Sequence, residues 1–111
     1  MREAEVMREV MLELSKLRRP DGSAVCIIWR QQSGVFMGPS GHVVRVGIEG
    51  QADLGGVLCN GRALQIETKS ATGRLREPQE RWRGMVERMG GLWILARSAD
   101  DAVAAVRAAI E

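Results

Sequence analysis

The sequence contains little histidine and little cysteine. His42 is the only histidine among 111 residues, and Cys26 and Cys59 are the only cysteines. A single histidine leaves almost no material for a histidine-based zinc site or for a catalytic triad. The two cysteines fall in predicted strands without the spacing of a metal-binding pair, so we expect free thiols in a reducing compartment.

The sequence also lacks a long apolar run, an internal repeat, a low-complexity tract and a linker. No stretch approaches the length of a membrane-spanning helix, and Met1-Arg2-Glu3 does not open a signal peptide. We therefore expect a single domain over residues 1–111, in the cytoplasm and with no membrane partner. The net charge of +2 and the pI of about 8.9 permit nucleic-acid binding but do not predict it by themselves.

Lysine is the third scarce residue, because the chain holds fourteen arginines but only two lysines, Lys16 and Lys69. A lysine ammonium is a compact charge whose pKa shifts readily on burial, which makes it chemically distinct from an arginine. Lys69 ends the segment Glu67-Thr68-Lys69, and thirteen residues separate this segment from Gly50-Gln51-Ala52-Asp53. Lys69 is therefore a candidate catalytic residue.

A β-hairpin is predicted between these two segments. Asn60-Gly61 between two apolar runs favours a two-residue type I′ turn, in which both central residues have positive φ. The turn would pair residues 54–59 with residues 62–69, and Cys59 would then face Arg62.

This register decides which polar side chains meet at the open end of the hairpin. Counting outward from the turn places Asp53 opposite Thr68, which is one residue away from Glu67. A bulge at Gly55-Gly56 would remove this one-residue offset and bring Asp53 opposite Glu67. Side chains alternate along a strand, so Glu67 and Lys69 are expected to point the same way, beside Asp53.

The three charged side chains suit a magnesium-dependent phosphodiesterase. Mg²⁺ prefers a few carboxylate oxygens together with waters and substrate phosphate, so Asp53, Glu67 and the backbone carbonyl of Thr68 are candidate ligands. Lys69 would orient or deprotonate an attacking water, or offset charge on the scissile phosphate. The alternative is a solvated strand with an ordinary Glu–Lys ladder, which a Glu-x-Lys motif alone usually is. Asp53 across the hairpin favours the catalytic interpretation.

Three segments together resemble the VRR-NUC domain, the virus-type replication-repair nuclease branch of the PD-(D/E)XK superfamily. They are Gly50-Gln51-Ala52-Asp53, Glu67-Thr68-Lys69, and Gln79 within Glu77-Pro78-Gln79-Glu80-Arg81-Trp82. Arg30-Gln31-Gln32-Ser33-Gly34 also fits, as does Gly90-Gly91 before an apolar strand. The resemblance covers nearly the whole chain. Ala52 departs from it, because the family usually has proline before the aspartate, which changes the approach to the strand rather than the ligands.

The resemblance implies a fold, a cofactor and partners. The fold would be a restriction-endonuclease-like α/β core, with a mixed central β-sheet flanked by helices. The activity would be structure-selective DNA cleavage with Mg²⁺, or with Mn²⁺ in its place, by a homodimer similar to Holliday-junction resolvases. Such a domain would act in the cytoplasm of a bacterium or of a phage-infected host. Two alternatives remain open. One is a flap endonuclease or nickase that uses the same site, and the other is a catalytically idle module that binds branched DNA.

The first helix is predicted from about residue 3 to residue 17, because apolar residues recur there at helical spacing. They are Val6, Val10, Leu14 and Leu17. Extended backwards, this stripe reaches Glu3, whereas Glu5 belongs to a solvated acidic face. In the resembling family a glutamate of the first helix joins the metal site, and Glu3 is the matching position. Glu5 remains the alternative, since acidic residues are favoured in a first helical turn regardless of function.

The helix opened by Pro78 has a predicted inward face of Gln79, Trp82, Val86 and Met89. Gln79 is therefore expected to point toward the catalytic end. By the resemblance it supports the site or contacts the phosphate, and the alternative is an ordinary polar cap. The remaining expected elements are a strand at 24–29, a hairpin within 35–46, a strand at 92–96 and a helix that opens at Ser98. Together these elements predict an α/β fold with a mixed sheet.

Seven further residues are candidates for contacts with DNA, because they lie in loops expected near the catalytic strands. They are Arg30, Gln32, Ser33, Arg45, Gln51, Arg74 and Arg76. For each arginine taken alone, a solvated surface position is the commoner outcome.

Overall fold

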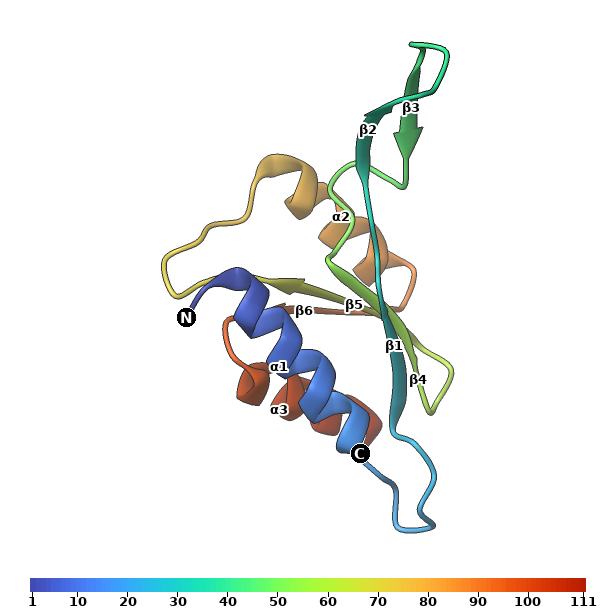
Figure 1. The fold of residues 1–111 in the computed structure, drawn as a ribbon. Helices are drawn as coiled ribbons and strands as arrows, with labels where there is room; N and C mark the ends of the chain where they lie inside the picture. The colour runs from blue at the N-terminus through green and yellow to red at the C-terminus, as the bar shows by residue number, and fades with distance from the viewer.

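A four-stranded mixed sheet forms the centre of the protein (Figure 1). The computed structural model describes all residues 1–111. The strand order is β1 (Cys26–Arg30), β4 (Leu54–Leu58), β5 (Ala63–Thr68) and β6 (Leu92–Ala96). The first three strands are antiparallel neighbours, whereas β5 and β6 are parallel and are joined by α2 (Glu77–Arg88). The expected mixed α/β sheet flanked by helices is confirmed.

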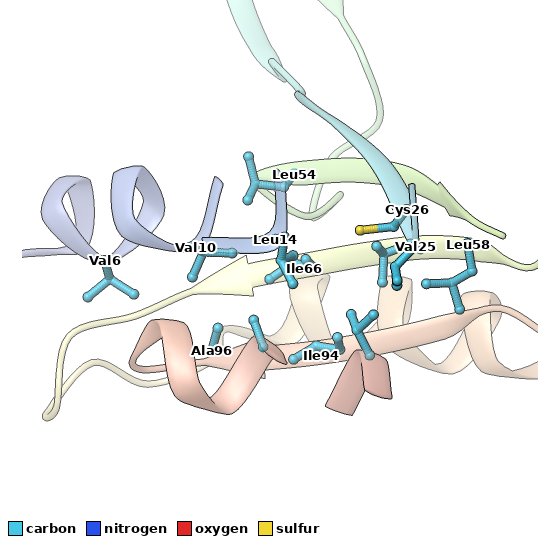
Figure 2. Close-up of a cluster of buried hydrophobic side chains, with 13 residues drawn as sticks. Val6, Val10, Leu14, Val25, Cys26, Leu54, Leu58, Ile66, Ile94 and Ala96 are labelled. Atoms are coloured by element: carbon cyan, nitrogen blue, oxygen red, sulfur yellow. The ribbon is translucent and has the colours of Figure 1, made fainter. Parts of the chain in front are cut away.

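Helices α1 (Glu3–Lys16) and α3 (Ala99–Ile110) pack against each other and cover one face of the sheet. The predicted stripe of α1 is confirmed, because Val6, Val10 and Leu14 are fully buried. Figure 2 shows these side chains converging with Leu54 and Ile66 of the sheet. Burial of such a continuous apolar surface is the main stabilising contribution to a domain of this size.

Helix α2 covers the opposite face of the sheet along β6. The predicted inward face of α2 is confirmed for Gln79 and Val86, which are buried, and Trp82 is half-buried. The prediction for Met89 was wrong, because the helix ends at Arg88 and the side chain of Met89 is 82% exposed. Met89 lies after the last helical residue, so the helical period no longer directs it toward the sheet.

The β4–β5 hairpin differs from the predicted turn by one residue. The Leu58 N–H donates to the Arg62 carbonyl at 2.9 Å, which leaves a three-residue loop of Cys59, Asn60 and Gly61. Only Gly61 has positive φ, so the turn is not the type I′ turn that we expected. The loop also places Cys59 outside the strand, where it is half-buried.

The predicted bulge at Gly55-Gly56 was also wrong. The pairing runs without interruption from Val57–Ala63 to Leu54–Ile66. The Gly56 position lies so close to the carbonyl oxygen of Ile27 that a side chain there would collide with it. These glycines therefore allow β1 to approach β4 closely, rather than adding a residue to the ladder.

Strands β2 (Gly34–Met37) and β3 (Val43–Val46) form a separate two-stranded hairpin, as predicted for residues 35–46. We refer to residues 34–46 as the arm. The arm projects from the end of β1 away from the rest of the molecule (Figure 1), which gives overall dimensions of 52 × 29 × 27 Å. A hydrogen bond of 2.9 Å from Gln51 Nε2 to the Gln32 carbonyl ties the two chain segments together at its base. None of the three helices combines the length and the apolar character that crossing a membrane requires.

Candidate active site

Asp53 and Glu67 lie across from each other where β4 and β5 meet. Leu54 pairs with Ile66, so the next position along the antiparallel ladder places Asp53 opposite Glu67. The Gln31 N–H donates to the Asp53 carbonyl at 2.8 Å and extends the pairing of β1 with this segment. The backbone of Asp53 is thus held between two neighbouring strands, and no bulge is needed to bring the carboxyl groups together.

Thr68 holds the carboxylate of Asp53 in place. The backbone N–H of Thr68 donates to Asp53 Oδ2 at 2.9 Å, and the Thr68 hydroxyl donates to the same oxygen at 2.8 Å. Thr68 is buried, with 2% of its surface exposed. Both bonds engage one oxygen of Asp53, which leaves Oδ1 to face another ligand.

Glu67 is a buried acid, with 4% of its surface exposed. Its burial is the main cause that raises the pKa of Glu67 to about 8, followed by a hydrogen bond to Asp53 and the negative charge of Asp53. The positive charge of Lys69 acts in the opposite direction on this pKa. Because this pKa lies above neutral pH, Glu67 retains its proton at pH 7 in the absence of a cation.

Lys69 follows the end of β5 and is almost completely buried, with 8% exposed. Its N–H donates to the Ala96 carbonyl at 3.1 Å and continues the parallel pairing with β6. The Lys69 ammonium lies 3.8 Å from Oε1 of Glu3, at the first turn of α1. Of the two glutamates considered for the first helix, Glu3 is the one that reaches the site, whereas Glu5 forms no ion pair.

Arg97, which no sequence motif singled out, supports the segment that covers Lys69. Arg97 Nη1 donates to the carbonyls of Ser70 and Gly73 at 2.6 and 2.7 Å. A side chain added at Gly73 would contact Lys69 Cδ and Glu3 Oε1, so this loop lies directly against the ion pair. The available signal was positional: Arg97 follows β6 as Lys69 follows β5, and parallel strands place such residues side by side.

Gln79 caps its own helix. Its Oε1 accepts a hydrogen bond of 2.9 Å from the Arg76 N–H at the start of α2, and the side chain is buried. Gly50 packs against the backbone of Pro78 and Gln79, so the segment that leads to Asp53 runs past the N-terminus of α2. The geometry thus gives Gln79 a structural role near the site and shows no contact with the carboxylates.

The seven predicted DNA-contact residues are spread around the protein rather than gathered at one point. Gln32, Ser33 and Gln51 lie at the base of the arm, and Arg45 lies on β3 of the arm itself. Arg74 and Arg76 are exposed in the loop between Lys69 and α2. Arg30 ends β1 and borders a shallow groove with residues of α1.

The donor set of the site fits a magnesium ion that keeps most of its own waters. No three side chains of His, Cys, Asp or Glu gather into a ready-made metal cluster. Asp53 and Glu67 are nevertheless adjacent, and neither is consumed by an ion pair. Mg²⁺ typically binds through one or two carboxylates plus waters and substrate phosphates, so Asp53 and Glu67 would be a sufficient protein contribution, and the Thr68 carbonyl stays a predicted third ligand.

No family model, curated protein or solved structure matches this chain. The chemistry of the site is therefore inferred from its own residues. A protonated Glu67 beside the Asp53 carboxyl group and a buried ammonium is arranged to exchange its proton for a cation and to hold a negatively charged substrate next to it. The two largest surface grooves, of about 660 and 860 Å³, lie elsewhere and contain none of these side chains. The site is thus not a closed pocket for a small molecule.

Proposed function

We propose that this chain is a metal-dependent, structure-selective DNA endonuclease that hydrolyses phosphodiester bonds with Mg²⁺, or with Mn²⁺ in its place. The observation that carries the proposal is the convergence of Asp53, Glu67 and Lys69, three charged-type residues that meet at one end of the central sheet. The resemblance of the same residues to the VRR-NUC pattern supports it, and with it a restriction-endonuclease-like core.

The roles follow from the chemistry of each group. Asp53, Glu67 and the Thr68 carbonyl would hold the metal, which when bound polarises a phosphate oxygen and lowers the pKa of a bound water. Lys69 offers a positive charge to the scissile phosphate or orients the attacking water. Glu3 holds the Lys69 ammonium through their ion pair, and Gln79 fixes the N-terminus of α2 next to the Asp53 segment.

The site has no enclosed pocket, and Asp53 is its partly exposed carboxylate. This suits a polymer better than a small metabolite, because a duplex can lie across the surface above Asp53. The proposed substrate is branched DNA, as for Holliday-junction resolvases. A four-way junction needs two opposed cuts, and a homodimer with two-fold symmetry would place two sites at a fixed separation. The exposed Arg74 and Arg76, in the loop that follows Lys69, are the candidate phosphate contacts nearest to it in the sequence.

Cleavage of matched substrates tests the proposal. Duplex, flap, single-stranded and four-way-junction DNA would each be incubated with Mg²⁺, Mn²⁺ or a chelator. Lys69→Ala is the site variant, and Lys16→Ala is a matched control, because Lys16 is exposed and pairs only with Glu13 on the surface of α1.

The outcomes separate the open functions. Paired, metal-dependent cuts in the junction that disappear in Lys69→Ala and persist in Lys16→Ala support a resolvase. Cuts confined to flaps or single strands retain the nuclease and replace the resolvase with a flap endonuclease or a nickase. Junction binding without cleavage under any metal would contradict the nuclease and favour a module that only binds branched DNA.

A further inference from the structure

The arm exposes apolar side chains on both of its faces. Six of its residues are 38–72% exposed: Val35, Phe36, Met37, Val43, Val44 and Val46. Phe36 is paired with Val44, and Met37 is paired with Val43. Because successive side chains of a strand point to opposite faces, these pairs lie on opposite sides of the arm. A lone two-stranded hairpin is marginally stable in water, so an arm of this composition needs a covering surface.

A second apolar surface lies uncovered on the central sheet. Ile27 and Val57 are directly paired on β1 and β4, and Trp29 lies two residues further along on the same face. Their side chains are 66%, 44% and 46% exposed, because α2 covers only the β6 side of this face. We refer to Ile27, Trp29 and Val57 as the open sheet face.

The total surface of the chain is larger than its mass predicts. The accessible area is 6969 Å² for 12.2 kDa, whereas the scaling law for folded monomers gives about 6100 Å². The excess of about 900 Å² is close to the roughly 800 Å² that each partner buries in a stable protein–protein interface. The exposed surface of the chain is therefore large enough to include an interface of standard size.

The chemistry of the arm favours a protein over a nucleic acid as its partner. The arm carries Arg45 and the single histidine, His42, as its only basic side chains, whereas binding along a phosphate backbone depends on many cations. Arg45 and the nearby Glu49 have opposite charges and form no ion pair within the chain. In a two-fold dimer each would be available to the other copy, since such an interface brings residue i against j and j against i.

We propose that two copies of this chain form a homodimer in which the arm of each copy packs on the open sheet face of the other. Each chain then supplies both halves of the contact, an apolar arm and an apolar face. The dimer does not depend on nuclease activity, because Asp53, Glu67 and Lys69 belong neither to the arm nor to the open sheet face.

Sedimentation equilibrium over a range of protein concentrations tests the dimer in the absence of DNA. The wild-type chain should reach twice 12.2 kDa. Phe36→Ser on the arm and Ile27→Ser on the open sheet face should each raise the dissociation constant about tenfold or more, as buried apolar anchors of an interface do. Leu12→Ser is the matched control, because Leu12 is an exposed leucine on α1, 54% exposed, and its variant should remain dimeric.

Two outcomes would overturn the proposal. One is a wild-type chain that stays at 12.2 kDa at every concentration, and the other is either interface variant dimerising as tightly as wild type. Hydrogen exchange of the wild type gives a readout that does not rely on variant folding, since the arm amides should become protected as concentration rises. Lys69→Ala should stay dimeric whether or not it cuts DNA, so failure of the dimer and failure of the nuclease are separable.

Discussion

The carboxylate of Asp53 accepts two hydrogen bonds from Thr68, one from its backbone N–H and one from its hydroxyl. The backbone donor is present whatever residue occupies position 68, but the hydroxyl bond depends on the residue type. Together they direct one oxygen of Asp53 toward Thr68 and turn the other away from it. Thr68, which lies between Glu67 and Lys69 in the sequence, therefore sets the orientation of Asp53.

Replacement of Thr68 by valine tests this orientation. Thr68→Val keeps the shape of the buried side chain and removes only the hydroxyl donor, so we expect a loss of about 1 kcal/mol in the free energy of unfolding. The affinity for Mn²⁺ should also fall, because the carboxylate gains freedom to rotate. Urea denaturation and calorimetric titration measure the two effects. Thr72→Val, at an exposed threonine of the following loop, should leave both unchanged.

The stability of the metal-free protein should decrease as the pH rises. The folded state raises the pKa of Glu67 from its ordinary 4.5 to about 8, so the folded protein binds this proton more tightly than the unfolded chain does. The resulting stabilisation is complete below pH 4.5 and is lost between pH 4.5 and pH 8. Thermal unfolding in the presence of a chelator should show this decline, and Glu67→Gln should flatten it. An equal slope in both proteins would contradict the assignment to Glu67.

Arginine should not replace Lys69. The guanidinium keeps the charge but is larger and planar, and a compact ammonium is needed in a space closed by Glu3 and the Ser70–Gly73 loop. We expect Lys69→Arg to bind junction DNA as wild type does. Its cleavage rate should be lower by a factor of about a hundred or more. Lys16→Arg is the control and should cut normally. Full cleavage by Lys69→Arg would mean that the charge alone matters.

Removal of the Arg97 guanidinium should loosen the loop over Lys69. Arg97→Met loses two hydrogen bonds to backbone carbonyls, each worth about 1.5–3 kcal/mol when the donor is charged. Hydrogen exchange should accelerate in residues 70–73, and the cleavage rate should fall while DNA affinity is retained. Arg107→Met, at an exposed arginine of α3, should change neither. If Arg97→Met lowers stability without faster exchange in this loop, Arg97 is a general structural residue and not a positioning residue.

Much of the fold follows from local patterns. The apolar spacing of α1 predicted its buried face because a helix repeats every 3.6 residues whatever surrounds it, and Val6, Val10 and Leu14 are indeed fully buried. The turn type at Asn60-Gly61 was wrong, yet Asp53 still lies opposite Glu67. The three-residue loop shifts the strand pairing by one residue relative to the predicted two-residue turn. The predicted bulge at Gly55-Gly56 would have produced the same shift.

The sequence by itself therefore determined which elements form and that Asp53, Glu67 and Lys69 belong to one site, since a hairpin brings together residues that are close along the chain. Only the tertiary structure decided the protonation of Glu67, because burial and the nearby carboxyl group of Asp53 arise from packing. It also decided that Glu3 is the glutamate that meets Lys69, and that Arg97 holds the loop beside it. These residues come from segments distant in the sequence, and only the closing of α1 and β6 onto β5 makes them neighbours.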